Sequence, residues 1–213
     1  MSLQSIFTKG NFEPIHSEFK NEGIRSLDML SDFQEKFKMF DTDTTINAIR
    51  DTIIADYLNY DLVNSDKHGF DAKKSKTGEF LEVKNCSVSS TGWGGTWNDT
   101  NEEKALAFGD KRVFTAVAIW RGASDLEFIV YGQNKKMGEY LHSKVINRKS
   151  GSRSTQSISI QKLIKEWGFV VILPPGKSEK NTIQSIVRYQ RSLNDYVTLK
   201  TIKTVSNFQR KFY

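Results

Sequence analysis

The fold is decided by His68-Gly-Phe-Asp-Ala-Lys-Lys-Ser-Lys-Thr-Gly-Glu-Phe-Leu-Glu-Val-Lys-Asn85. Two short runs of alternating apolar and polar residues flank a polar turn, which predicts a β-hairpin. Side chains along a strand alternate between the two faces of a sheet. One face of the hairpin is therefore expected to carry Phe70, Ala72, Leu81 and Val83.

The opposite face is expected to carry Asp71, Glu82 and Lys84. The two carboxylates, held on rigid backbone, can bind a hard cation such as Mg²⁺, with the backbone carbonyl of Val83 as a further ligand. The ammonium of Lys84 then lies beside the ion as a base or charge stabiliser. This chemistry suits phosphodiester hydrolysis, in which Lys84 orients or deprotonates the attacking water. A nearby cation lowers the pKa of a lysine ammonium, which permits the base role.

The Glu-x-Lys triplet alone is weak evidence, because residues 18–20 and 102–104 also carry it. Its context here is stronger, since an aspartate between apolar residues and then a turn come before Glu82. The alternative is a surface hairpin with a solvated charged face, in which Glu82 pairs with Lys73 or Lys84.

Gly69-Phe-Asp71 followed by Glu82-Val-Lys84 resembles the core of the PD-(D/E)xK nucleases, without the proline of that name. Among these, the chain most resembles a type II restriction endonuclease. The resemblance covers about residues 44–175 and rests on a short motif and the order of elements. It implies an α/β fold with a central mixed β-sheet flanked by helices, Mg²⁺-dependent cleavage of duplex DNA, and a homodimer. It also implies metal ligation by Asp71 and Glu82 and water activation by Lys84.

A helix is predicted upstream of the hairpin. Asp43 and Thr44 are suitable N-caps, and apolar residues follow at helical spacing: Ile46, Ile49, Ile53 and Tyr57. The resemblance places a first-helix acid at the metal site, and Asp51 is the matching residue. A surface aspartate paired with Arg50 or a lysine is the alternative.

A segment rich in glycine and tryptophan, residues 91–100, follows the second strand of the hairpin. Trp93 and Trp97 can press on sugar, Asn98 can pair with a base edge or phosphate, and Lys104 on a following helix can face a phosphate. Equally, the two indoles can cover the core.

The rest of the chain predicts one α/β core with helical N- and C-terminal segments. The lead-in, residues 1–40, has aromatic residues at helical spacing that are expected in the core: Phe33, Phe37 and Phe40. Val113 to Trp120 predicts a strand buried on both faces. Other elements are expected at 126–131 and 169–173 (strands) and at 137–147, 159–167 and 181–213 (helices).

Residues 1–176 are expected to form the nuclease core. A basic helical extension, 177–213, is expected to belong to the same domain or to be an appendage for dimerisation or DNA binding.

Composition limits the function classes. The net charge is +6 and the pI is about 9.2, which favours a polyanionic partner. A basic cluster, Arg148, Lys149 and Arg153, is a candidate for base contacts in DNA. No apolar run is long enough for a membrane span, no signal peptide is visible, and the single cysteine Cys86 fits a reducing cytoplasm.

Other chemistries have little support. The three histidines lack zinc-ligand spacing, and there is no phosphate-binding glycine loop, nucleophile elbow or sign of an organic cofactor. Two alternatives to a restriction enzyme stay open. One is a homing, repair or junction-resolving nuclease on the same core, and the other is a non-catalytic nucleic-acid-binding protein.

Overall fold

The computed structural model describes residues 17–62, 70–98, 100–147, 155–199 and 201–204. It divides the chain into two compact units, Met1–Thr45 and Ile46–Tyr213. In the first unit, helix α2 spans Ser17–Phe37. The core role predicted for the aromatic residues of the lead-in is wrong for Phe37 and Phe40, which are 53% and 65% exposed.

Helix α3 spans Thr42–Tyr57. Its N-cap is Asp41, whose Oδ1 accepts a hydrogen bond from the backbone N–H of Thr44 at 2.7 Å, so the predicted caps Asp43 and Thr44 are wrong. The predicted apolar stripe is only partly right, because Ile49 is 37% exposed. The second half of the helix packs against the sheet, where Ile54, Ala55 and Tyr57 belong to a core cluster that Leu58 joins just after the helix.

A seven-stranded mixed sheet occupies the centre of the second unit, in the order β1-β2-β3-β5-β6-β8-β9. Its parallel pairs are β3–β5 and β8–β9, and its other pairs are antiparallel. The strands are β1 Asp61–Leu62, β2 Ala72–Lys74, β3 Glu79–Ser87, β5 Val113–Arg121, β6 Asp125–Gly132, β8 Val170–Leu173 and β9 Ile202–Thr204. A two-stranded sheet pairs β4 (Gly94–Trp97) with β7 (Gln156–Ser159).

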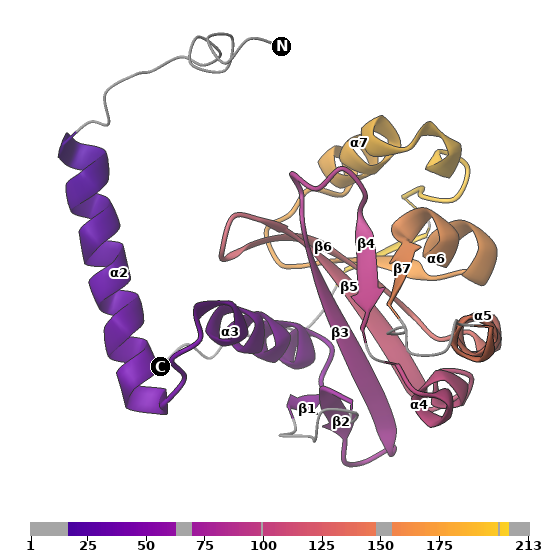
Figure 1. Cartoon of the computed structure of the whole chain (residues 1–213). Coiled ribbons are helices and arrows are strands. Elements are labelled where there is room, and N and C mark those ends of the chain that lie inside the picture. The colour runs from indigo at the N-terminus through magenta and orange to yellow at the C-terminus, as the bar shows by residue number, and fades with distance from the viewer. Residues whose placement is uncertain (1–16, 63–69, 99, 148–154, 200, 205–213) are drawn as a thin grey trace, which may run out of the picture. The chain divides into compact units, whose positions relative to one another are not determined.

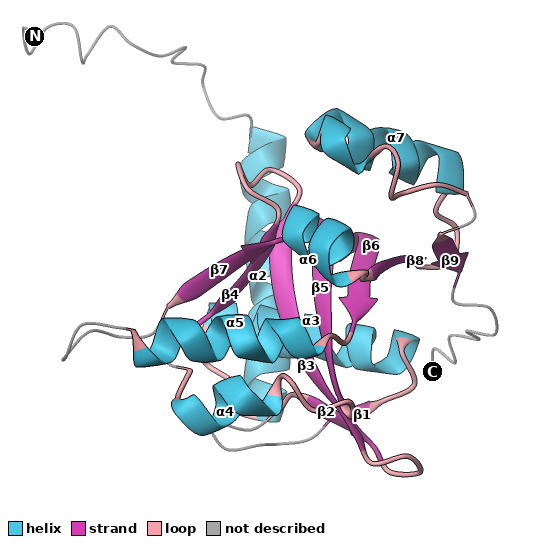
Figure 2. Cartoon of the chain, turned by 90° about the vertical axis from the view of Figure 1, so that its right-hand side faces the viewer, coloured by secondary structure: helices cyan, strands magenta, loops and turns pink. Residues whose placement is uncertain are grey.

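Helices cover both faces of the central sheet, so the predicted α/β fold with a mixed sheet is confirmed (Figure 1). The part of α3 in this unit covers one face, and Figure 2 shows α4, α5 and α6 in front of the other. The remaining helices are α4 Glu102–Ala107, α5 Lys135–Ile146, α6 Ile160–Trp167, α7 Glu179–Tyr189 and the 3₁₀ turn η1 Arg191–Leu193. Alternate side chains of β5 belong to the two core clusters, with Val117 and Ile119 on one face of the sheet and Ala118 and Trp120 on the other. The prediction of a strand buried on both faces is confirmed.

The C-terminal region differs from its prediction. Helix α7 is found, but the chain then forms η1 and β9, which adds to the sheet parallel to β8. Ile186, Leu193 and Ile202 belong to the larger core cluster. The described residues 179–199 and 201–204 are thus part of the second unit.

Candidate active site

The predicted hairpin is confirmed. Strands β2 and β3 pair antiparallel, with Ala72 opposite Leu81, around the turn 75–78. Gly78 closes that turn with a φ of +71° and donates its N–H to the carbonyl of Lys74 at 2.8 Å. A positive φ is accessible to glycine without steric cost, which explains this residue at this point.

One apolar residue of the hairpin lies on a face other than the predicted one. Ala72, Leu81 and Val83 pack on the α3 side of the sheet, as expected. Phe70 packs with the opposite cluster, its ring centroid 5.7 Å from that of Phe80. Residues 70 and 71 precede β2, so the strict alternation of a strand does not extend to them.

Asp71 is fixed against β3 by two hydrogen bonds on either side of Glu82. Its backbone N–H donates to the carbonyl of Leu81 at 2.9 Å. Its Oδ2 accepts from the backbone N–H of Val83 at 2.7 Å. Burial raises the pKa of Asp71, and the negative charge of Glu82 adds to the rise.

Glu82 is 3% exposed and lies between two ammonium groups. Lys84 Nζ is 2.7 Å from its Oε1, and Lys104 Nζ is 3.0 Å from its Oε2. The second distance is an ion-pair distance, but Oε2 accepts no hydrogen bond of good geometry from the described residues. This buried carboxylate therefore has one oxygen with unused acceptor capacity.

Lys84 packs against the glycine-rich strand β4. A Cβ on Gly95 would lie 2.9 Å from the Cβ of Lys84, and Lys84 Nζ lies 6.0 Å from the centre of the Trp97 ring. Burial acts to lower the pKa of Lys84, but the carboxylates of Glu82 and Asp71 outweigh it and raise that pKa. The chain's own residues thus favour the ammonium form.

Asp51 reaches the same place from α3. Its Oδ1 accepts a hydrogen bond from Asn85 Nδ2 at 2.8 Å, and Asn85 Oδ1 accepts one from Trp120 Nε1 at 2.9 Å. Burial raises the pKa of Asp51 to about 6, against the lowering effect of the Asn85 hydrogen bond. Arg50 donates instead to the carbonyls of Gly122 and Ala123, so pairing between Arg50 and Asp51 is not what holds Asp51.

These groups border a groove of about 540 Å³. Asp51, Asp71 and Lys84 line it, whereas Glu82 does not. All five residues 83–87 of β3 line it, because β2 pairs with β3 only as far as Leu81. The unpaired edge of β3 beyond that point therefore opens into the groove. The other lining residues are Asn47, Ser90, Gly92, Gly94, Thr96 and Asn98.

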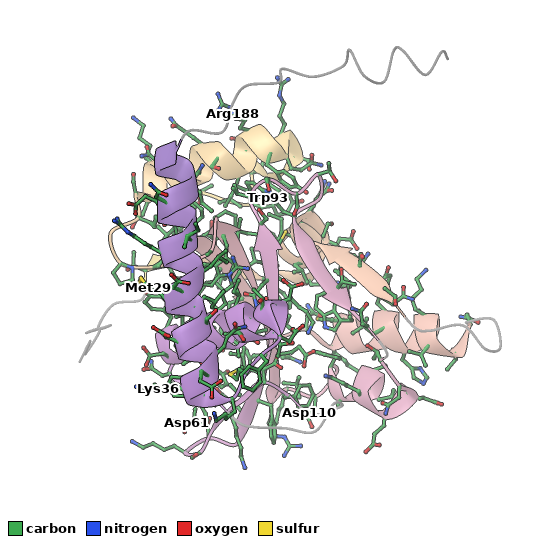
Figure 3. All side chains as sticks on the ribbon, turned by 60° about the vertical axis from the view of Figure 1, so that its left-hand side comes forward. Met29, Lys36, Asp61, Trp93, Asp110 and Arg188 are labelled. Carbon is green, nitrogen blue, oxygen red and sulfur yellow. The ribbon has the colours of Figure 1, made fainter. Side chains whose placement is uncertain are left out.

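The remaining predicted contact residues fall into three groups. Trp93 and Trp97 are 5% and 1% exposed, so both indoles are buried in the core, which was the second of the two roles expected for them. Figure 3 labels Trp93 near α7, whose Tyr189 ring stacks on it at 4.2 Å. Asn98 is exposed and lines the groove, and Lys104 faces Glu82. The last group lies outside the described residues: Arg148, Lys149 and Arg153.

The donor set fits Mg²⁺ better than a closed structural metal site. The charges of Asp71 and Glu82 raise the pKa of Asp51, and the charge of Glu82 raises the pKa of Asp71, which places three carboxylates within electrostatic reach. Across the described ranges, no three histidine, cysteine, aspartate or glutamate side chains are close enough to hold an ion together. Mg²⁺ needs only one or two protein carboxylates and fills its octahedron with water and substrate oxygens.

Comparisons with known proteins do not assign the chain to a family. No protein-family model matches the chain, and no curated protein matches it significantly. Within the part of the chain that the structure describes, no helix has both the length and the apolar character needed to cross a membrane.

Several site residues were not predicted from the sequence, among them Asn47, Asn85 and Gly95. Asn47 lies one helical turn before Asp51, and i, i+4 spacing places both on one helix face. Asn85 follows the Glu-x-Lys triplet on the strand face that meets α3. Gly95 is identifiable only from its packing against Lys84, which local sequence does not reveal.

Proposed function

We propose that this protein is a Mg²⁺-dependent endonuclease that hydrolyses phosphodiester bonds of duplex DNA at a short specific site, as type II restriction enzymes do. The observation that carries the proposal is the Asp71–Glu82–Lys84 arrangement. Asp71 is bonded to the backbone on both sides of Glu82, and Lys84 Nζ lies 2.7 Å from the Glu82 carboxylate. A surface hairpin with solvated charges would not bury Glu82 to 3% exposure.

The proposed chemistry assigns one role to each residue. Asp71 and Glu82 would hold Mg²⁺, with the Val83 carbonyl as a further oxygen donor. Asp51 does not complete a three-carboxylate site with them in this structure, so its proposed part in metal binding would run through a water on the ion. The ion would supply Lewis-acid charge at the scissile phosphate. Water attacks phosphorus, the bond to the 3′ oxygen breaks, and the products carry a 5′-phosphate and a 3′-hydroxyl. Lys84 orients that water and offsets charge on phosphorus, a role that suits its ammonium form.

The groove supports a nucleic-acid substrate through its polar lining. Exposed amide and hydroxyl groups, such as those of Asn47, Thr96 and Asn98, can hydrogen-bond to sugar, phosphate or base edges. The net charge of +6 adds sequence-independent attraction to phosphates. Duplex DNA as substrate, a homodimer that matches a two-fold symmetric site, and a cytoplasmic location complete the proposal.

The direct test is incubation of the purified chain with plasmid and phage DNA in Mg²⁺, followed by sequencing of the ends. We expect cleavage at fixed short sites, none in EDTA, and 5′-phosphate termini. Glu82→Ala and Lys84→Ala should lose cleavage and keep most DNA binding, measured by a mobility-shift assay. If both variants cut like the unmodified protein, the site assignment is wrong.

The pattern of products separates the alternatives. Cleavage of branched or damaged DNA without fixed sites would identify a repair or resolving enzyme on the same residues. Binding that persists in EDTA, with no Mg²⁺-dependent nicking of any substrate, would identify a non-catalytic binding protein and overturn the proposal.

A further inference from the structure

Glu82 has two lysine partners from different parts of the chain. Lys84 comes from the same strand, two residues on, and lines the groove. Lys104 comes from α4, and its Nζ lies 3.2 Å from Oε1 and 3.0 Å from Oε2 of Glu82. One ammonium is thus shared between both oxygens of a carboxylate proposed as a metal ligand.

Lys104 is an internal residue and not part of the groove wall. Its side chain is 13% exposed, and it does not line the groove. Its ammonium also lies 5.5 Å from the centre of the Phe70 ring, next to Asp71 in the chain. Asn101 caps α4 by accepting the backbone N–H of Lys104 at 2.7 Å, which fixes the start of its side chain.

We propose that Lys104 is a positioning residue that acts as the internal counter-ion of Glu82, aligning this carboxylate and competing with the divalent cation for it. The inference rests on the proposed metal site. It replaces the expectation that Lys104 contacts a DNA phosphate, because its ammonium is directed at a buried carboxylate and not into the groove.

The balance of charges at the site predicts how the affinity for divalent cations changes when Lys104 is replaced. The site gathers three carboxylates, Asp51, Asp71 and Glu82, and two ammonium groups, Lys84 and Lys104. Removal of one ammonium leaves more uncompensated negative charge on Glu82 and its neighbours. Divalent cations should then bind more tightly, while Glu82 loses the contact that fixes its orientation.

The test measures metal binding separately from catalysis. Mn²⁺ alone is titrated calorimetrically into the unmodified chain, Lys104→Met and Lys104→Arg. Lys177→Met is the matched control, since Lys177 also contacts two carboxylates, Asp125 and Glu127, away from the site. We expect Lys104→Met to bind Mn²⁺ at least about fivefold more tightly. Lys104→Arg and Lys177→Met should stay near the unmodified value.

Cleavage gives a second readout that general destabilisation would not produce. Lys104→Met should reach half-maximal rate at lower Mg²⁺ concentration while its maximal rate falls. Circular dichroism checks folding, and Lys104→Gln replaces a Met variant that does not fold. Failure of both to fold would show a purely structural role and overturn the inference.

The remaining outcomes separate this inference from the proposed function. If Glu82→Gln weakens Mn²⁺ binding but a folded Lys104→Met leaves it unchanged or weaker, the counter-ion role is wrong and the metal site stands. If Glu82→Gln has no effect on Mn²⁺ binding, the metal is not at Glu82, and both proposals fail.

Discussion

Gly95 lies directly against Lys84: a Cβ at residue 95 would be 2.9 Å from both Cβ and Cγ of the lysine. A Cβ atom essentially never lies this close to a carbon atom to which it is not bonded. The stem of the proposed catalytic lysine therefore packs on a surface that only glycine leaves open. Strand β4 therefore limits the directions in which the Lys84 side chain can extend.

This contact gives the first prediction. Gly95→Ala should displace Lys84 and the nearby Trp97, lower the cleavage rate sharply, and cost on the order of 1–3 kcal/mol of stability. Gly23→Ala is the control, because a Cβ there would meet no atom within 4 Å and Gly23 does not line the groove. Cleavage rates and denaturant unfolding of both variants test whether the packing of Gly95 against Lys84 supports activity and stability. Equal activity of the two variants would contradict the packing role.

Lys84 itself can be compared with a lysine on the same hairpin. Lys84→Ala should reduce the cleavage rate by about 10²–10³-fold, because charge stabilisation in a water-poor site is lost. Lys73→Ala should stay close to the unmodified rate, since Lys73 is exposed on β2 and does not line the groove. Single-turnover rates at saturating Mg²⁺ measure the difference. Similar losses in both variants would point to a general charge effect.

Asn85 joins α3 to the sheet and should matter for stability as well as for the site. Asn85→Ala leaves Trp120 Nε1 without its acceptor and Asp51 without its donor, at a cost of about 1–3 kcal/mol. Asn98→Ala, at an exposed position, should change stability by no more than about 0.5 kcal/mol. Urea unfolding of both variants is the measurement, and equal midpoints would show that the bridge contributes nothing.

Helix α7 should behave as part of the second unit rather than as an appendage. The Tyr189 hydroxyl accepts the backbone N–H of Trp93 at 2.6 Å. Tyr189→Phe removes this acceptor and should cost about 1–2 kcal/mol. Tyr196→Phe, at a 40% exposed position, should be nearly neutral. A single shared unfolding transition is expected for both, followed by near-ultraviolet and far-ultraviolet circular dichroism. Separate melting of the C-terminal region would contradict this integration.

Metal removal should stop catalysis without unfolding the protein. The second unit is held by two apolar clusters on the faces of its sheet, and no closed metal cluster is present among the residues described. EDTA should therefore abolish cleavage and leave the thermal midpoint within a few degrees. Differential scanning calorimetry with and without EDTA tests this, and a collapse of the midpoint would indicate a structural ion.

The sequence predicted those parts of the fold that short patterns specify. The alternation of residues 79–85 located β3 and its polar face, and the apolar run from Val113 located β5. The predicted stripe of α3 was partly wrong, because where a helix meets a sheet depends on tertiary packing. Strand β9 was missed, since three residues at a sheet edge carry no measurable period.

The candidate site was predictable to a similar extent. Asp71, Glu82 and Asp51 were identifiable from local spacing and the family resemblance, and the structure brings them within electrostatic reach. The pairing of Lys104 with Glu82 joins residues 22 positions apart through the placement of α4, which no short pattern encodes. The burial of Trp97 likewise depends on how β4 packs on β3.

The hairpin turn 75–78 carries no catalytic group, yet its length controls the site. Adding or deleting one residue there would shift the pairing of β2 with β3 by one position and move Asp71 out of step with Glu82. The exposed side chains at 75–77 can therefore vary more freely than the residue count of the turn or the glycine at its end, Gly78, which has a positive φ. Insertions and deletions at this exposed point should be as harmful to the proposed activity as loss of Glu82 or Lys84.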